Sequence, residues 1–212
     1  MARLYRALFA CVGWFAVALQ YGVTLADNPG QSPAELSLNF FSYFTILSNI
    51  LVALALTAPV VAPNSRAGRW LAGEAVRAAL AMYIVVVGVV YHVLLAPTWN
   101  PQGLALLGNT LLHYVMPAAF VLDWLLFAPK GRLKSGDPAR WLIFPLVYGG
   151  WTLIHGALSG WWPYPFVDVG ALGLARVLVN FVGLLIFFLI VGLTIVTLDR
   201  TFGRRDRSRA SA

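Results

Sequence analysis

Hydroxyl, amide and imidazole side chains recur inside the apolar stretches of this chain at spacings that bring them together. The segment FSYFTILSNI carries Ser42, Thr45 and Asn49 at spacings of three and four, which is one face of a helix. Asn109 and His113 form a second pair with helical spacing. A hydroxyl beside an imidazole can cleave an ester, because the imidazole takes the hydroxyl proton and later returns it to the leaving alcohol.

Further polar side chains lie in the same apolar stretches. The full set is Thr45, Ser48, Asn49, His92, Asn109, His113, Asp123, Thr152, His155, Arg176 and Asn180. Such residues are costly inside a membrane and indicate function. If each stretch is a helix, Thr45 lies roughly 10 Å below Leu38 and His113 roughly 13 Å below Leu104 at about 1.5 Å per residue. Most of the set then gathers in the outer half of the membrane, while Asp123 is interpreted as a solvated or paired charge near the other end.

Other chemistry remains open for this set. Two histidines on facing helices could bind a haem or a quinone, and the candidates are His92, His113 and His155. A polar cavity could also bind a lipid without reacting. The three histidines could also bind a metal ion, although no carboxylate shares their depth. No HExxH, GxSxG, P-loop or Rossmann motif is present.

The elements that must position these side chains are membrane helices. The chain is 60% hydrophobic and only 11% charged, whereas about a quarter of a soluble domain is charged. We predict an all-α integral membrane protein with six transmembrane helices in a single bundle. The expected helices are 4–26, 38–61, 73–95, 104–127, 140–158 and 171–198, which form one domain over 1–199 before a basic tail, 200–212, without fixed structure. Pro117, four residues after His113, should kink its helix.

The positive charges follow a topological pattern. Lysines and arginines occupy the N-terminus, the second and fourth joints and the C-terminal tail, while the first, third and fifth joints contain none. Cytoplasmic loops of membrane proteins collect positive charge, so both termini are predicted to be cytoplasmic. The net charge of +7 is thereby assigned to topology, and no nucleic-acid partner is expected. The single cysteine, Cys11, excludes an intrachain disulfide and a cysteine-ligated metal site.

Three stretches together resemble a known family. They are YFTILSN, GNTLLHYVMP and YGGWTLIHGALSGWWPYPF, the last followed by the Ala-Arg pair that contains Arg176. They resemble the androgen-induced-gene proteins, the androgen-dependent TFPI-regulating protein and their bacterial six-helix relatives, over most of the chain from Leu38 onward. Taken by composition alone, the WWPYPF part is typical of aromatic residues at a membrane interface.

The resemblance implies a function and a site. Animal members of the family are integral-membrane threonine hydrolases that cleave fatty acid esters of hydroxy fatty acids with a threonine and a histidine on different helices. By motif, these residues are Thr45 and His113. The spacing from His113 to Pro117 is one residue shorter than in animal members, and the residues after Thr45 differ, which bears on the substrate. The bacterial branch implies a location in the cytoplasmic (inner) membrane of a bacterium.

The sequence therefore predicts a lipid-ester hydrolase with Thr45 as the nucleophile and His113 as its general base. The expected partners are a lipid or fatty-acid ester and the membrane, with no cofactor and no metal. The supporting or substrate-binding candidates are Ser48, Asn49, His92, Asn109, His155, Arg176 and Asn180. Among these, Arg176 near the outer surface would suit the carboxylate of a fatty acid.

Overall fold

The computed structural model describes residues 1–210, with the side chains of 205–210 excepted, and all of its regular secondary structure is helical. Six helices in this part of the chain are long and apolar enough to cross a membrane. They are Ala2–Ala26, Phe44–Val61, Glu74–Thr98, Gly103–Phe127, Asp137–Ser159 and Leu174–Arg204. The predicted all-α, six-span architecture is confirmed. Helices suit this environment because each satisfies its backbone polar groups internally.

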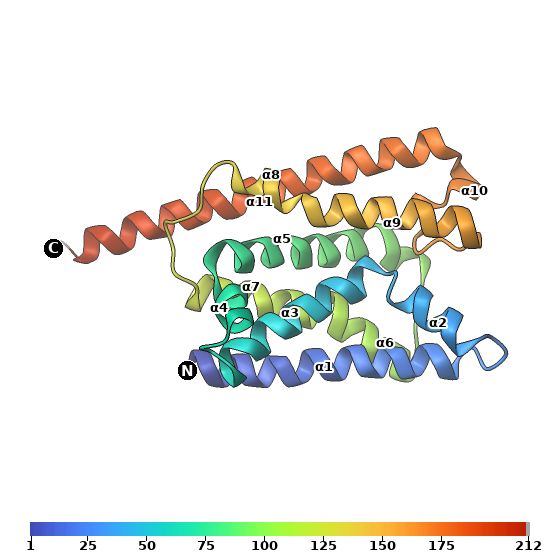
Figure 1. The fold of residues 1–212 in the computed structure, drawn as a ribbon, viewed down its shortest axis with the longest axis horizontal. Coiled ribbons are helices and arrows are strands. Elements are labelled where there is room, and N and C mark those ends of the chain that lie inside the picture. The colour runs from blue at the N-terminus through green and yellow to red at the C-terminus, as the bar shows by residue number, and fades with distance from the viewer. Residues whose placement is uncertain (211–212) are drawn as a thin grey trace.

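The long helices lie side by side along one axis (Figure 1). They are α1 (Ala2–Ala26), α3 (Phe44–Val61), α5 (Glu74–Val90), α6 (Gly103–Thr110) continued by η3 (Leu111–Val115) and α7 (Met116–Phe127), α9 (Ile143–Ser159) and α11 (Leu174–Ala210). Helix α5 is central, since it packs against α3, α7 and α11, and most of its side chains are buried. Helix α11 continues to Ala210 where a tail without fixed structure was expected, and residues 211–212 lie outside the described part.

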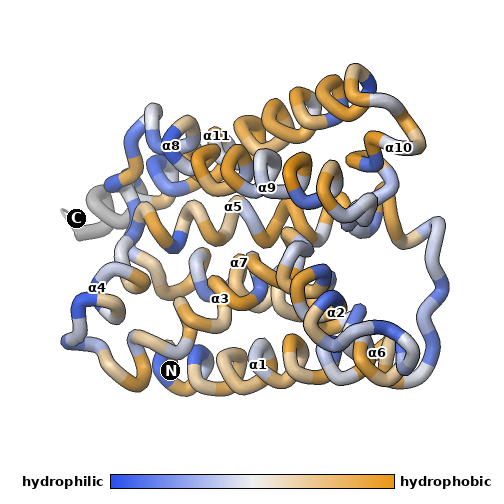
Figure 2. Tube along the Cα trace, turned by 45° about the vertical axis from the view of Figure 1, so that its right-hand side comes forward, coloured by the Kyte–Doolittle hydropathy of each residue, from blue (hydrophilic) through white to orange (hydrophobic). Residues whose placement is uncertain are grey.

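The two ends of the bundle differ in charge. The N-terminus, the short helix α4 (Arg66–Ala72), α8 (Asp137–Trp141) and the C-terminal end of α11 lie at one end (Figure 1). The joints without lysine or arginine, which include α2 (Pro33–Phe40) and α10 (Val169–Leu172), lie at the other. Apolar residues dominate the helices between these ends (Figure 2). This arrangement is the one that the charge pattern requires, and we call the end with few basic residues the acidic end.

The second span is interrupted where the sequence predicts one continuous helix from Leu38 to Val61. Helix α2 ends at Phe40 and α3 begins at Phe44, after Tyr43 adopts an extended backbone. Side chains of α9 stabilise the break by hydrogen bonds to Ser42. Tyr148 donates to the Ser42 carbonyl at 3.0 Å, and Trp151 donates to the Ser42 hydroxyl at 3.0 Å. Thr45 consequently lies in the first turn of α3.

The predicted kink before Pro117 takes the form of a widened turn. Residues Leu111–Val115 are π-helical, and the Met116 N–H reaches the Leu111 carbonyl, five residues back. Pro117 has no N–H to continue the α-helical pattern. Turns of this kind occur often at functional sites, and His113 lies inside this one.

A buried ion cluster of Arg6, Arg77 and Asp123 lies toward the end of the bundle that holds the N-terminus. Asp123 has no exposed surface, so its interpretation as a solvated charge is wrong and the paired alternative holds. One carboxylate oxygen accepts from Arg6 Nε at 2.8 Å and the other from Arg77. The Arg77 guanidinium also donates to the Ala55 carbonyl at 3.0 Å and lies over the Phe120 ring. This cluster joins α1, α3, α5 and α7.

Candidate functional site

A cavity of about 430 Å³ lies toward the acidic end of the bundle, beside the break between α2 and α3. Its wall comes from α1, the helix break, the end of the third span, the fourth span and the fifth joint. The lining residues that carry polar groups are Gln20, Thr24, Asp27, Asn28, Tyr43, Thr45, Tyr91, Thr98, Trp99, Asn109, His113 and Tyr164. Ligand sites in proteins are usually cavities of this size with a few polar groups.

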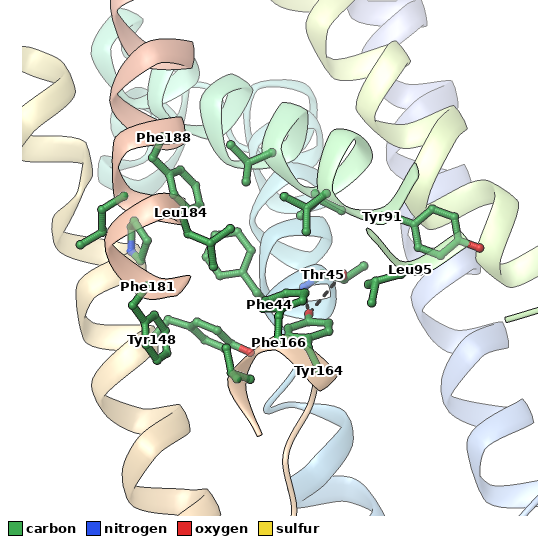
Figure 3. Close-up of a pocket in the computed structure, with 16 residues that line it drawn as sticks. Phe44, Thr45, Tyr91, Leu95, Tyr148, Tyr164, Phe166, Phe181, Leu184 and Phe188 are labelled. Atoms are coloured by element: carbon green, nitrogen blue, oxygen red, sulfur yellow. Dashed lines mark hydrogen bonds between the residues drawn. The ribbon is translucent and has the colours of Figure 1, made fainter. Parts of the chain in front are cut away.

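A second, apolar cavity of about 70 Å³ adjoins the first, and we call it the slot. Figure 3 shows its lining, in which phenylalanine and leucine side chains such as Phe181, Leu184 and Phe188 face an interior beside Thr45. Thr45 and Tyr164 line both spaces, as do Tyr91 and Leu95. A ligand at Thr45 therefore has a polar chamber on one side and an apolar slot on the other.

Thr45 sits at the N-terminus of α3, where backbone N–H groups have no partner within the helix. Its own N–H donates to the Tyr164 hydroxyl at 3.3 Å, and its Oγ1 lies 3.4 Å from the same hydroxyl (Figure 3). The side chain is buried apart from 8% of its surface. The positive end of the helix dipole favours negative charge that develops at this position.

The two ring nitrogens of His113 have different roles. Nδ1 lies 3.0 Å from the Asn109 carbonyl, four residues earlier in the chain. A carbonyl only accepts, so Nδ1 carries the proton and Nε2 has the lone pair of a base. The ring is stacked on Tyr91 with centroids 3.9 Å apart. These contacts hold the imidazole in one tautomer.

Thr45 and His113 line the same chamber from different spans, but no hydrogen bond joins them in the described structure. The threonine hydroxyl instead contacts Tyr164. A proton transfer from Thr45 to His113 therefore requires the threonine side chain to rotate or a bound group to bring the two together.

Two of the predicted asparagines support this pair. Asn109 lines the chamber, donates to the Tyr91 hydroxyl at 2.6 Å, and keeps its buried Oδ1 without a partner in the described structure. Asn49 is fully buried and does not line the chamber. Its amide donates to the carbonyls of Thr45 at 2.9 Å and Leu112 at 3.2 Å. It thereby ties the helix of Thr45 to the span of His113.

The other predicted residues do not line the chamber. Ser48 is buried with an unpartnered hydroxyl, and Arg176 is exposed on α11. Asn180 donates to the Phe166 carbonyl at 2.8 Å, which ties the fifth joint to α11. Ser42 belongs to the helix break, so the predicted single helix face of Ser42, Thr45 and Asn49 is wrong.

The three histidines lie in different environments. His92 is exposed, with Nδ1 3.2 Å from the Tyr114 hydroxyl. His155 is buried, and its ring packs against Trp151 and Trp161. Within the described residues, no group of three or more histidine, cysteine, aspartate or glutamate side chains could hold a metal ion.

The aromatic residues of the chamber are what sequence reasoning missed. The WWPYPF segment folds back onto the bundle, where Tyr164 reaches Thr45 and Trp161 packs on Tyr43 with centroids 5.2 Å apart. Burial raises the pKa of the Tyr164 hydroxyl and raises that of Tyr43 to about 12. Both hydroxyls therefore stay protonated and able to donate at neutral pH. The available signal was the Tyr-Pro-Phe triplet at residues 164–166, which the resemblance already contains.

Comparisons of this chain with protein-family models, with curated proteins and with solved structures find no match.

Proposed function

We propose that this protein is an intramembrane threonine hydrolase that cleaves lipid esters. The observation that carries the proposal is the placement of Thr45 and His113 on the wall of one chamber, with Nε2 of His113 free to act as a base. The resemblance to a family of threonine hydrolases supports the same pair. No cofactor is needed for this chemistry.

The reaction proceeds in two balanced halves. Thr45 Oγ1 attacks the ester carbonyl carbon while His113 Nε2 takes the hydroxyl proton. The ester C–O bond then breaks, and the alcohol leaves with that proton, so the acyl group stays on Thr45. Water attacks the acyl-threonine, His113 takes a proton from the water and returns it to Thr45, and the free acid leaves.

The negative charge on the carbonyl oxygen would be stabilised by two donors beside the nucleophile. One is the Thr45 N–H at the start of α3, and the other is the Tyr164 hydroxyl, which contacts that N–H. Preorganised donors of this kind are often the largest single contribution to acyl transfer. In the resting protein the Tyr164 hydroxyl accepts from the Thr45 N–H, so it must shift when a substrate oxygen enters before both groups can donate to that oxygen.

The apolar slot suits the part of an acyl chain next to the ester, because its volume of about 70 Å³ is much smaller than that of a whole fatty-acyl chain. Its wall consists mainly of phenylalanine, leucine and valine side chains from α5 and α11, and it meets the chamber at Thr45. An ester bond at Thr45 would then have the first part of its acyl chain in the slot and its alcohol part in the chamber.

Substitution of the two residues tests the proposal directly. Thr45→Ala and His113→Ala should each lower kcat/KM for lipid-ester hydrolysis by roughly 1,000-fold or more, since they remove the nucleophile or its base. Labelling by a fluorophosphonate probe should be lost in Thr45→Ala. The matched controls are Thr57→Ala, a hydroxyl on the same helix bonded to the Ala53 carbonyl, and His92→Ala, an exposed histidine. Full activity in either Thr45→Ala or His113→Ala would exclude the pair.

A non-catalytic lipid-binding or transport protein is the second candidate. The specific observation in its favour is that the Thr45 hydroxyl contacts Tyr164 and not His113. A purified protein that binds lipid but neither hydrolyses esters nor reacts with the probe would support it. A haem or quinone carrier finds no comparable support, because only His113 of the three histidines lines the chamber.

We also propose that both termini face the cytoplasm of a bacterium, across its inner membrane. The support is the collection of basic residues at the end of the bundle that holds the N-terminus, α4 and α8. A C-terminal alkaline phosphatase fusion should be inactive and a C-terminal green fluorescent protein fusion bright. The reverse result would invert the topology.

A further inference from the structure

The chamber contains no positively charged side chain. Among the described residues, its only charged or titratable groups apart from the tyrosines are Asp27 and His113, and no lysine or arginine lines it. Arg176, the residue predicted to hold a carboxylate, is exposed on α11 and lies outside both the chamber and the slot. A carboxylate inside this space would have no counter-charge, and burying an unpaired charge is costly.

The chamber does contain hydrogen-bond acceptors without donors. Asn109 is only 4% exposed, and its Oδ1 has no partner in the described structure. Gln20 Oε1, on α1, is also buried without a partner and lines the same chamber. Asp27 adds carboxylate oxygens at the exposed end of α1. Buried acceptors are normally satisfied, so the amide oxygens of Asn109 and Gln20 indicate a ligand that brings hydroxyl or N–H donors.

These two observations narrow the substrate class. We propose that the chamber takes an uncharged ester whose alcohol part carries free hydroxyl groups, as in a monoacylglycerol, and discriminates against esters with a free carboxylate. The inference rests on the proposed hydrolase function. A hydroxyl can donate to the oxygens of Asn109 and Gln20, whereas an ionised carboxylate only accepts. This substrate differs from the esters of hydroxy fatty acids that the resemblance implies, since those carry a carboxylate.

The geometry gives each part of such a substrate a place. The part of the acyl chain next to the ester occupies the slot, and the ester carbonyl lies between Thr45 and Tyr164, which line both spaces. The glycerol hydroxyls extend into the chamber toward Asn109 and Gln20, on the way to Asp27 at its rim. His113 then lies on the alcohol side, where the leaving oxygen needs a proton.

The first experiment compares two esters with the same acyl chain. Purified protein in lipid nanodiscs is given 1-oleoylglycerol or the oleoyl ester of 12-hydroxystearic acid, with Thr45→Ala as the blank. We expect kcat/KM to be at least 10-fold higher for the glycerol ester. Equal rates, or faster cleavage of the carboxylate-bearing ester, would overturn the inference while the hydrolase function stands.

A charge substitution at the rim sharpens this result. Asp27→Lys places a cation beside the chamber, so the preference for the glycerol ester should fall by about threefold or more. Glu35→Lys makes the same change of net charge at an exposed acid of the acidic end that does not line the chamber. It should leave the preference unchanged. An equal effect of both variants, or none from Asp27→Lys, would contradict the assignment.

A binding measurement keeps the inference testable if no ester is cleaved. The fluorescence of the tryptophans, one of which, Trp99, lines the chamber, is titrated with 1-O-oleylglycerol, a non-hydrolysable ether, and with oleate. Tighter binding of the ether, weakened at least fivefold in Gln20→Leu, supports the ligand class assigned to the chamber while the hydrolase proposal fails. Oleate binding that is equal or tighter overturns it.

Discussion

The ion cluster of Arg6, Arg77 and Asp123 and the chamber around Thr45 and His113 are both polar regions inside one membrane bundle, but their polar groups are satisfied differently. Each oxygen of Asp123 accepts from an arginine, and the side chains of Asp123 and Arg77 are 0% and 1% exposed. Within the described structure only Arg77 Nε of this cluster is buried without a partner. The chamber leaves the oxygens of Asn109 and Gln20 without partners and borders open space.

This difference separates structural from functional polarity. Charges buried against each other join helices, and removal of one partner leaves the other unpaired. Acceptors left free around a cavity cost stability and are useful only when a ligand satisfies them. The two regions should therefore respond in opposite ways to mutation, one in stability and the other in activity.

The largest effect is expected at Asp123. Asp123→Asn should lower the free energy of unfolding by about 3–5 kcal/mol, because Arg77 then stays buried with its main counter-charge removed. Thermal unfolding in detergent measures this loss. The control is Glu35→Gln, an exposed acid, which should change stability by less than about 0.5 kcal/mol. A loss below 1 kcal/mol at Asp123 would show that the cluster does not hold the bundle together.

Tyr164→Phe should change activity and leave stability nearly unchanged, which is the reverse of the expectation for Asp123→Asn. The variant keeps the ring, which stacks on Phe166 with centroids 5.2 Å apart, and removes only the hydroxyl beside Thr45. We expect kcat to fall roughly 10- to 100-fold with KM little changed. Unfolding should be nearly unaffected. A change in KM alone would instead assign the hydroxyl to substrate binding.

The free energy of unfolding should depend on the ionisation of Tyr43 at high pH. Its pKa is raised to about 12 by burial and by the nearby Tyr164, against about 10 in an unfolded chain. The folded protein therefore holds this proton between pH 10 and 12 after the unfolded chain has released it, so stability is fully present below pH 10 and falls as pH rises. Tyr43→Phe should reduce that loss by up to about 2 kcal/mol. If Tyr43→Phe and the unsubstituted protein lose the same stability between pH 10 and 12, the burial of this hydroxyl is contradicted.

The smallest effect is expected at Ser48, which has a buried, unpartnered hydroxyl outside the chamber. Ser48→Ala removes a polar group with no bond to lose, so stability should stay equal or rise by up to about 1 kcal/mol. Hydrolysis should be unchanged. A tenfold loss of activity would show that Ser48 contributes to the site.

Much of the fold is predictable from local patterns. Length and hydropathy define the six spans, and the distribution of lysine and arginine places alternate joints at opposite ends. The break at Ser42 was missed because its cause is not local: the hydroxyl of Tyr148 and the indole of Trp151, more than a hundred residues away, hold the Ser42 backbone and hydroxyl. The burial of Arg77 beside Asp123 was missed for the same reason.

The candidate site also has a part that local spacing predicts and a part that depends on contacts between distant residues. Helical spacing pairs Asn109 with His113, and the structure keeps this pair through the bond from Nδ1 to the Asn109 carbonyl. Spacing could not separate His113 from His92 and His155, since all three occur in apolar segments. It also could not show Tyr164 at Thr45, because a joint folds back over the bundle to bring it there.

By itself, then, the sequence determined the helical class, the spans and the polar residues that merit attention, because these depend on composition and short-range periodicity. Only the tertiary structure decided which polar side chains share a chamber, which are paired into an ion cluster, and which carry no role at the site. Those outcomes depend on contacts between spans, and the break before Thr45 shows that such contacts can override the local preference for a continuous helix.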